Sequence, residues 1–456
     1  MNSIHHQLET ASNATRDALA NSEPKSLRTF TPSQAVFSKS AGVFHWTPEG
    51  RRLYDYSSGV LVSNLGHNPT HWTQRFFGYM GWSPELFTSR EEYFPAVTMT
   101  AYNAITEIET KASERLINSL QRTKHGQNMQ QVVWSASGSE AVQKALWACL
   151  HRDPNRNLII ATRHGFHGKK GLAGAVTGSE CDRERDPRVK FISFPMAECD
   201  DIESPSQPFD VAPYRRELDL LWEQYGLKLT CLITEPYLGG GGSYHPPKEY
   251  LQMLQQWCSE HDVLFILDEV QANFGRTSEM YAFEAYGIQP DFVCLGKGLG
   301  NGVPVSAAVG RRDILDPMPY GMTSDTWSAN PISCAAVLAT LDEFETRPIM
   351  EHAKTMHDVF RRGLVKLKET PLIHKVRGEG MVFGIECHET SKLDAAGVAN
   401  AVVKQCYLGN QDGLGIHLLG PLAGKVIRVS PPLTITQAEA DESLQLLYDL
   451  VKATPC

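Results

Sequence analysis

The sequence lacks several features that would define a function on their own. No apolar run approaches the length of a membrane span, and no GxxxxGK[ST] loop for a nucleotide phosphate is present. The ten cysteines include no CxxC pair, so no metal site is expected. The formal charge of −9 disfavours binding to nucleic acid or to an anionic membrane. What remains is an ordinary folded protein with small-molecule partners.

The N-terminal segment shows no targeting signal. Residues 1–25 carry Glu9, Asp17 and Glu23 and no apolar core. This matches neither a secretory signal nor an acid-poor transit peptide. Together with the scattered cysteines, it predicts reduced thiols and a cytoplasmic protein. Because residues 1–30 are polar, we expect them to be loosely ordered.

The 456 residues are too many for one compact core. Apolar runs alternate with helix-like stretches, which predicts an α/β domain whose mostly parallel sheet has seven strands and carries its ligand at their carboxyl ends. We expect residues 76–344 to form this large domain, and residues 1–75 and 345–456 a smaller α+β domain. The predicted strands are 131–136, 157–162, 189–194, 229–236, 263–270, 291–296 and 305–310.

The run QVVWSASGSEAVQKAL (131–146) passes from a strand into the start of a helix. Ser137, followed three residues later by Glu140, matches a capping box. Gly138 and Ser139 would then expose backbone N–H groups at a helix N-terminus, where phosphates bind. A capped helix without a ligand would show the same pattern, so this run does not decide the matter alone.

The run VLFILDEVQ (263–271) ends a predicted strand with acid. Asp268 and Val270 share one face, whereas Glu269 points to the other. A buried aspartate needs hydrogen bonds or a cation. A protonated ring nitrogen about 3 Å away, at an effective dielectric near 20, would be attracted by roughly 5 kcal/mol before desolvation is subtracted. A structural salt bridge is the alternative.

Two further strand ends carry an aromatic ring and an amine. Phe166, in ATRHGFHGKKG, could stack on a flat ring held against Val270, and Lys297, in FVCLGKGLGNGVP, lies among glycines that allow close approach. A core phenylalanine and a surface lysine are the alternatives. Taken together, an anion site, a carboxylate, an aromatic face and an amine match the phosphate, pyridine ring and aldehyde of pyridoxal phosphate.

The segment DEVQANFGRTSEMYAFEAYGIQPDFVCLGKGLGNGVP (268–304) resembles the signature of the class III (ω-amino acid) aminotransferases, which include 4-aminobutyrate and ornithine aminotransferases. The resemblance covers nearly the whole chain, and it implies a fold-type I pyridoxal-phosphate transferase that forms a homodimer with shared active sites. The other matching segments are NLGHNP (64–69), SASGSEAVQKAL (135–146), GFHGK (165–169), TEPYLGGGG (234–242), DTWSANP (325–331) and IRVSPPLTIT (427–436).

The resemblance also implies residue roles. Lys297 would form the Schiff base with the cofactor and then carry the proton between substrate and cofactor. Asp268 would keep the ring nitrogen protonated. The other implied cofactor-binding residues are Gly138 and Ser139 for the phosphate, Phe166 and Val270 for the ring faces, His167, Glu235, Gln271 for the ring hydroxyl, and Thr326, which would reach the phosphate of the neighbouring subunit.

The substrate-binding positions depart from the family's pattern. Arg428 aligns with the arginine that holds the substrate α-carboxylate. Gly240 stands where many relatives carry a glutamate that closes over this arginine, and Lys169 stands where aminobutyrate transaminases carry an arginine. We therefore expect an ω-amino acid or amine donor with 2-oxoglutarate or pyruvate as acceptor, without favouring 4-aminobutyrate.

Two alternatives share these motifs. A decarboxylating transaminase, an aminomutase or a racemase of the same fold would carry the same residues around Lys297. A regulatory or binding protein of this fold without turnover is the second alternative, although every group that the chemistry requires is present. A nucleotide-binding interpretation of GKGLGNG fails, because no strand–GxGxxG–helix unit with a downstream acid surrounds it.

Overall fold

The computed structural model describes residues 4–88, 91–182, 186–199, 201–203, 208–421 and 423–456. The chain divides into two compact units. Residues 1–69, 200–204 and 351–456 form what we call the terminal unit, and residues 70–199 and 205–350 form the central unit. The expected assignment of residues 1–75 and 345–456 to one small domain stays a prediction. Among the residues described, no helix combines the length and the apolar character needed to cross a membrane.

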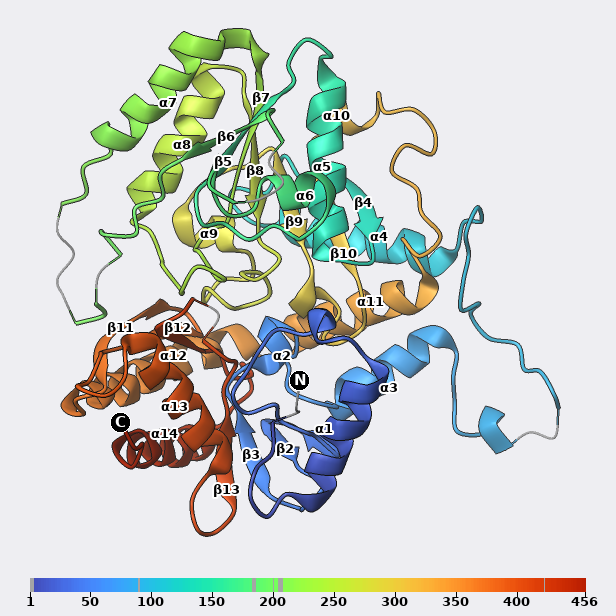
Figure 1. Ribbon diagram of the computed structural model, residues 1–456. Coiled ribbons are helices and arrows are strands. Elements are labelled where there is room, and N and C mark those ends of the chain that lie inside the picture. The colour runs from blue at the N-terminus through green and yellow to red at the C-terminus, as the bar shows by residue number, and fades with distance from the viewer. Residues whose placement is uncertain (1–3, 89–90, 183–185, 200, 204–207, 422) are drawn as a thin grey trace. The chain divides into compact units, whose positions relative to one another are not determined.

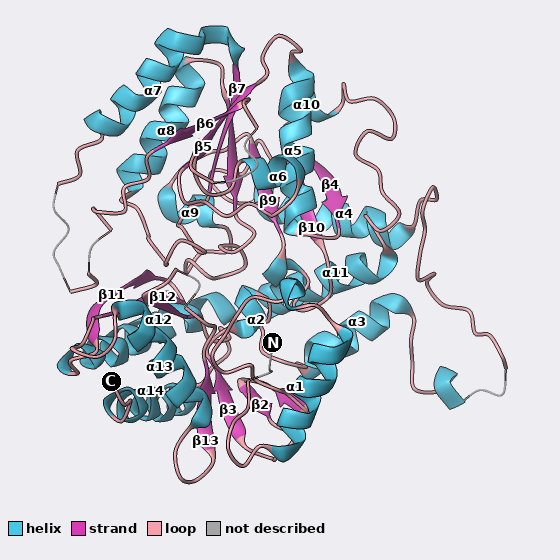
Figure 2. Ribbon diagram, in the orientation of Figure 1, coloured by secondary structure: helices cyan, strands magenta, loops and turns pink. Residues whose placement is uncertain are grey.

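The central unit is built on the predicted seven-stranded sheet (Figures 1 and 2). Strand β10 runs antiparallel to both its neighbours, β4 and β9, and the other neighbouring pairs are parallel. The fold prediction, including all seven strands, is therefore confirmed. In sheet order the strands are β4 (Gln131–Ser135), β10 (Ser306–Gly310), β9 (Phe292–Leu295), β8 (Leu264–Asp268), β7 (Leu229–Thr234), β5 (Leu158–Thr162) and β6 (Val189–Ile192).

Helices cover both faces of this sheet (Figure 1). Helix α5 packs Ala141, Val142 and Ala145 into a buried core with Ile266 and Phe292 from the strands. Because the strands are covered on both faces, the polar residues at their carboxyl ends must find hydrogen-bond partners or a ligand. The helices of the unit are α3 (Thr70–Met80), α4 (Glu107–Gln121), α5 (Gly138–Arg152), α6 (Gly171–Ala175), α7 (Ala212–Tyr225), α8 (Lys248–Glu260), α9 (Ala282–Tyr286), α10 (Arg312–Leu315) and α11 (Pro331–Thr346).

The terminal unit contains two small sheets that join distant parts of the chain. The first has the order β1 (Lys39–Ala41), β2 (Phe44–Trp46), β3 (Arg52–Asp55) and β13 (Leu414–His417), with β13 parallel to β3. The second has the order β11 (Ile373–Glu379), β12 (Val382–Cys387) and β14 (Val426–Val429). The helices are α1 (Thr10–Ser22), α2 (Ser58–Leu61), α12 (Ile349–Val365), which begins in the central unit, α13 (Ala395–Leu408) and α14 (Gln437–Lys452).

The expectation that residues 1–30 are loosely ordered is wrong, because this segment contains helix α1. Arg16 donates a hydrogen bond to Glu9 (2.7 Å) and another to the hydroxyl of Tyr407 (2.9 Å), and both charged side chains are almost fully buried. Arg51 also pairs with Glu9. Composition alone treats charged residues as exposed, whereas here they neutralise one another against helix α13.

Candidate active site

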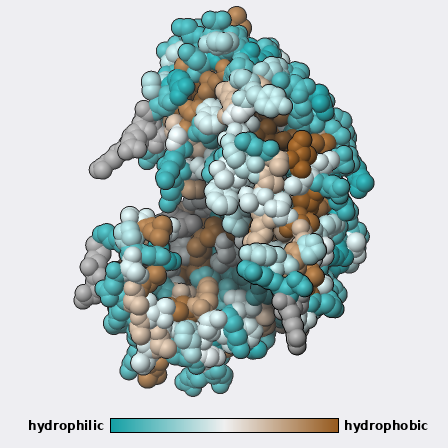
Figure 3. Space-filling view, turned by 90° about the vertical axis from the view of Figure 1, so that its right-hand side faces the viewer, coloured by the Kyte–Doolittle hydropathy of each residue, from teal (hydrophilic) through white to brown (hydrophobic). Residues whose placement is uncertain are grey.

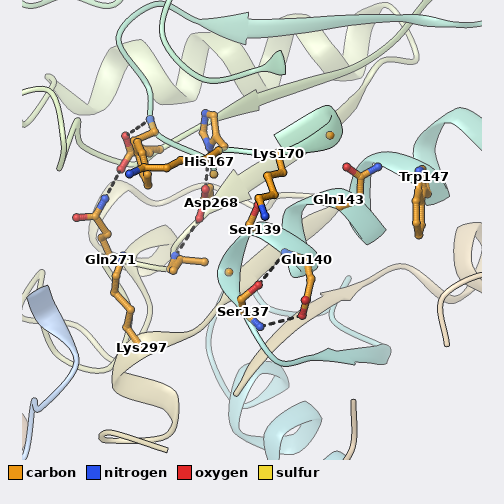
Figure 4. Close-up of a pocket in the computed structure, with 17 residues that line it drawn as sticks. Ser137, Ser139, Glu140, Gln143, Trp147, His167, Lys170, Asp268, Gln271 and Lys297 are labelled. Carbon is orange, nitrogen blue, oxygen red and sulfur yellow. Dashed lines mark hydrogen bonds and ion pairs between the residues drawn. The ribbon is translucent and has the colours of Figure 1, made fainter. Parts of the chain in front are cut away.

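A cavity of about 760 Å³ lies at the carboxyl ends of the parallel strands, within the central unit (Figure 4). This is where an open α/β sheet places its ligands. Ten residues singled out by the sequence line it: Gly138, Ser139, Phe166, His167, Lys169, Glu235, Asp268, Val270, Gln271 and Lys297. The lining also includes residues that the sequence did not single out as ligand contacts, among them Gln143, Trp147 and Lys170.

The start of helix α5 forms an anion-binding corner of this cavity. Ser137 is the N-cap and its hydroxyl accepts the N–H of Glu140 (3.4 Å), while the Glu140 carboxylate accepts the N–H groups of Ala136 (2.9 Å) and Ser137 (3.1 Å). The capping box therefore occupies the neighbouring amides. The N–H groups of Gly138 and Ser139, which have no partner inside the helix, lie at the cavity wall and suit a phosphate.

Asp268 lies at the end of β8 and is 4% exposed. One carboxylate oxygen pairs with Nδ1 of His167 (2.7 Å), and the other accepts the N–H of Val270 (3.0 Å). Because a carboxylate only accepts, Nδ1 of His167 must carry the hydrogen. The pair holds a negative charge at the cavity wall, which suits a protonated ring nitrogen. Glu269 points to the opposite side, where it accepts the N–H groups of Ala282 and Phe283.

A second buried carboxyl group, Glu235 at the end of β7, organises the cavity wall. It accepts the N–H of Phe166 (2.9 Å) and a hydrogen bond from the side-chain amide of Gln271 (3.2 Å). Burial raises the pKa of Glu235 to about 7, against the opposing influence of nearby His167. Gly239 packs so closely here that a Cβ would lie 2.7 Å from the Gln271 side chain. Gln271 is thus held in one orientation.

Lys297 lies two residues after strand β9 and lines the cavity half-buried. Its φ of 48° is in the left-handed region, which a residue with a side chain rarely adopts. Such strain persists only where the surroundings impose it, and it concentrates at functional positions. At the preceding Gly296, a Cβ would lie 3.3 Å from Val270 and from Ser306. The absence of a side chain at Gly296 therefore allows the end of β9 to pack closely against Val270, which lines the cavity.

Two of the predicted site residues lie elsewhere. Thr326 is exposed on the loop between α10 and α11. Its neighbour Asp325 accepts a hydrogen bond from Lys144 (2.7 Å), a buried residue of helix α5. Burial opposes the charged form of Asp325, but the hydrogen bonds from Lys144 and Ser328 lower its pKa to about 2. Arg428 is buried on β14 in the terminal unit.

Comparison with known families decides what this site belongs to. The sequence model of the family Aminotransferase class-III matches residues 28–451. The chain belongs to this family. It is therefore an enzyme that transfers amino groups to a 2-oxo acid, and its cofactor is pyridoxal phosphate. The sequence-based predictions of family, enzyme class and cofactor are confirmed.

Relatives of this class-III aminotransferase match along almost their whole length. It is 29% identical to the acetylornithine aminotransferase of Agrobacterium fabrum, over 91% of this chain and 93% of that protein. It is 28% identical to the ornithine aminotransferase of Emericella nidulans, over 97% of this chain and 91% of the relative. The same fold is found in the crystal structure of the ornithine aminotransferase from Toxoplasma gondii, with a TM-score of 0.79, 22% identity and coverage of 98% and 96%.

The cavity of the class-III aminotransferase fits its cofactor. A Cβ on Gly138 would lie 2.8 Å from Val270, so the glycine leaves room where the phosphate corner meets the ring site. Among the described residues, no hydrogen-bond partner reaches the buried Nε2 of His167, behind the carboxylate that would meet the ring. The donors at the helix start, the carboxylate and the amine together match the phosphate, the ring nitrogen and the aldehyde carbon.

Sequence reasoning missed part of this lining. Gln143 and Trp147 follow the predicted capping box by about one and two helical turns, so helical spacing from Ser139 was the available signal. Lys170 adjoins Lys169 on the same exposed turn. These side chains line the cavity away from Lys297 (Figure 4).

Proposed function

We propose that this class-III aminotransferase takes the amino group of an ω-amino acid or an amine and transfers it to a 2-oxo acid such as 2-oxoglutarate or pyruvate. One observation carries the proposal. The amine of Lys297, the paired side chains of Asp268 and His167, and the N–H groups at the start of helix α5 surround a single cavity (Figure 4).

Pyridoxal phosphate, when bound, supplies a ring that accepts the electron pair left when a C–H bond beside the amino nitrogen breaks. The protein residues supply the remaining functions. Asp268, held by His167 and by the N–H of Val270, keeps a negative charge where the ring nitrogen would lie. Lys297 would move the proton with its Nζ. Gly138 and Ser139 hold the phosphate.

The donor class is proposed from two positions. Gly240 carries no side chain where many relatives carry a glutamate, and a Cβ there would lie 3.2 Å from Cβ of Phe166, so a side chain at this position would need Phe166 to shift by a few tenths of an ångström. Lys169 is exposed at the cavity wall and offers a cation to a distal carboxylate. The role of Arg428 at the α-carboxylate rests on the sequence resemblance.

A panel of amino donors tests this proposal. We expect ω-amino acids and simple amines to bleach the visible absorbance of the bound cofactor. Lys169→Ala should raise KM roughly tenfold for donors with a distal carboxylate, the value of one charge-assisted hydrogen bond, and leave simple amines unaffected. Lys170→Ala, on the same turn, is the matched control. Bleaching by α-amino acids alone would rule out the ω-donor.

The alternative reactions remain distinguishable. A decarboxylating transaminase would release carbon dioxide with each turnover, and a mutase or racemase would isomerise a single substrate without consuming a 2-oxo acid. Stoichiometric consumption of donor and acceptor, followed by chromatography of both products, separates these outcomes. A protein that binds the cofactor but turns over no amine in the panel would favour the regulatory alternative.

We further propose a homodimer in which Thr326 of one subunit contacts the phosphate bound in the other. Supporting this, Tyr320 and Trp327, on the same loop, are 109% and 64% exposed, and Ile105 is 90% exposed. Apolar side chains are visible on the face of the central unit in Figure 3. Large exposed apolar side chains on this unit would be covered in a dimer, which supports the proposal.

Mixed dimers test the shared site. Lys297→Ala and Thr326→Asp chains should each be inactive as pure dimers. After unfolding and refolding together, a mixed dimer holds one site with both native residues, so activity should return. No recovery, despite mixed dimers shown by mass spectrometry, would contradict the shared site. A fully active particle with the mass of one chain in light scattering would contradict the dimer.

We place the enzyme in the cytoplasm. All ten cysteines are free thiols and eight of them are buried, as expected for a reducing compartment. Fractionation of the native cells with an antibody against the chain would test this location.

A further inference from the structure

Three side chains meet inside the terminal unit, away from the active-site cavity. His45 lies on β2, and Asp55 is the last residue of β3. His67 lies outside the named strands and forms an isolated antiparallel bridge with Gly42. Each residue offers one atom of a type that binds metal ions, and these atoms lie within 4.8 Å of one another. The side chains of His45, Asp55 and His67 are 5%, 0% and 15% exposed, so water screens the group little.

Asp55 is oriented like a metal ligand. One of its oxygens accepts three hydrogen bonds, from the N–H of Ser57 (2.7 Å), the hydroxyl of Ser57 (2.8 Å) and the N–H of Ser58 (3.0 Å). The other oxygen therefore faces the two imidazoles, at 2.7 Å from Nε2 of His67 and 3.5 Å from Nε2 of His45. A carboxylate fixed in this way presents a single oxygen to a cation.

His45 is oriented from its other ring nitrogen. Nδ1 lies 2.6 Å from the hydroxyl of Ser40, and the ring stacks on Phe37 at 3.9 Å. When Nδ1 donates its hydrogen to Ser40, the lone pair of Nε2 points at the Asp55 oxygen. In that tautomer Nε2 and the Asp55 oxygen are both acceptors, and a cation placed between them would satisfy both. A hydrogen bond to the second nitrogen is the usual support of a metal-binding histidine.

We propose that His45, Asp55 and His67 bind a Zn²⁺ ion. Imidazole and carboxylate ligands suit zinc, and nitrogen or oxygen ligands at about 2.1 Å in a tetrahedron lie about 3.4 Å apart. The 3.5 Å between His45 and Asp55 already matches this spacing. His67, the most exposed of the three, has to move outward by about 0.7 Å to reach that spacing.

His417 lies beside this group, but it is not among the residues whose ligand atoms lie within 4.8 Å of one another, so it would have to move to act as a fourth ligand. The ring of His417, at the end of β13, lies edge-on to His45 with 5.6 Å between centroids. Its buried Nδ1 has no hydrogen-bond partner among the described residues. A zinc ion here would join β2 and β3 to the segment at His67. An ion that binds only the folded state stabilises that state, so we expect the ion to act in stability.

Metal content and stability of the full-length enzyme with its cofactor test the site. The protein is stripped with a chelator, returned to buffer, mixed with zinc sulfate and passed through gel filtration. We expect one zinc per chain by mass spectrometry of the metal and a higher unfolding temperature than for the stripped protein. Co²⁺ in place of zinc should give the visible absorption bands of a four-coordinate site, which the cofactor band does not overlap.

Variants show where the ion binds. His45→Gln should abolish retained zinc and the thermal shift, while the transamination rate of the stripped enzyme stays that of the parent. Ser40→Ala should weaken zinc affinity roughly 10–100-fold, the usual effect of removing an outer-shell hydrogen bond. Neither change touches the hydrogen bonds that Asp55 accepts from Ser57 and Ser58, so both variants should fold.

The matched control removes a different histidine pair. His374 and His388 are exposed with their rings 5.6 Å apart, and the double variant His374→Gln, His388→Gln should still retain one zinc. Zinc retained equally by His45→Gln, or lost only with the surface pair, would overturn the proposal. So would the absence of retained zinc in the parent, which would leave His45, Asp55 and His67 as a hydrogen-bonded cluster.

Discussion

Replacing Lys297 with alanine should lower the rate of amino transfer by about 10⁴-fold or more. A positioned proton carrier alone contributes up to about 10⁴-fold, and in our proposal the same amine also anchors the cofactor. The substitution removes the proton carrier and the cofactor anchor together, because both functions belong to Nζ of Lys297. Single-turnover kinetics measure the rate, and borohydride treatment followed by peptide mass spectrometry should find the cofactor's mass on residues 292–304 of the parent and not of the variant.

A second lysine of the cavity provides the control for Lys297→Ala. Lys170 also lines it, and Lys170→Ala should keep both the label on Lys297 and most of the rate. The left-handed φ of residue 297 strains alanine as much as lysine, so the backbone is equally disturbed in parent and variant. A label that moves to Lys169, or activity that survives in Lys297→Ala, would remove the basis of the proposed function.

Asp268→Asn should lower kcat by about 10³-fold. The attraction between the Asp268 carboxylate and a protonated ring nitrogen is roughly 5 kcal/mol before desolvation is subtracted, and the remainder corresponds to about this change in rate. The change keeps the size of the side chain and an oxygen for the N–H of Val270, but it removes the negative charge. Because the charge matters most while electrons flow into the ring, kcat should fall far more than cofactor affinity. Single-turnover rates and a cofactor titration followed by absorbance measure the two separately.

Glu269 is the matched control for Asp268, one residue away on the opposite face of the strand. Burial raises the pKa of Glu269 to about 8, so its side chain is largely neutral at pH 7. Glu269→Gln should lower the unfolding temperature, since one oxygen cannot accept the N–H groups of both Ala282 and Phe283. Its kcat per folded molecule should stay that of the parent. Equal losses of kcat in both variants would make the effect of Asp268 structural.

The active site was predictable because its signals are local. The predicted residues of the cavity lie at the ends of apolar runs or within a few residues after them, and the carboxyl ends of neighbouring parallel strands meet at one edge of a sheet. The capping box at Ser137 and Glu140 needs only four residues to be recognised, and it is present. The family's motifs then added roles that spacing alone left open.

What the sequence did not predict depends on contacts between distant segments. The sequence of residues 1–30 does not predict that Glu9 and Arg16 form a buried ion pair beside Tyr407. The group formed by His45, Asp55 and His67 has no ligand spacing of a known metal motif, because its members lie on β2, at the end of β3 and at an isolated bridge. A search for CxxC or similar pairs therefore predicted no metal site.

The parallel pairing of β3 with β13 has a consequence for biosynthesis. As the chain leaves the ribosome, β1, β2 and β3 emerge early, but the strand that completes their sheet follows only after nearly the whole remaining chain has been made. The central unit, whose segments lie between them, is complete first. Until translation reaches His417, one edge of β3 is open to wrong partners, so chaperone dependence should concentrate on the N-terminal segment of the nascent chain.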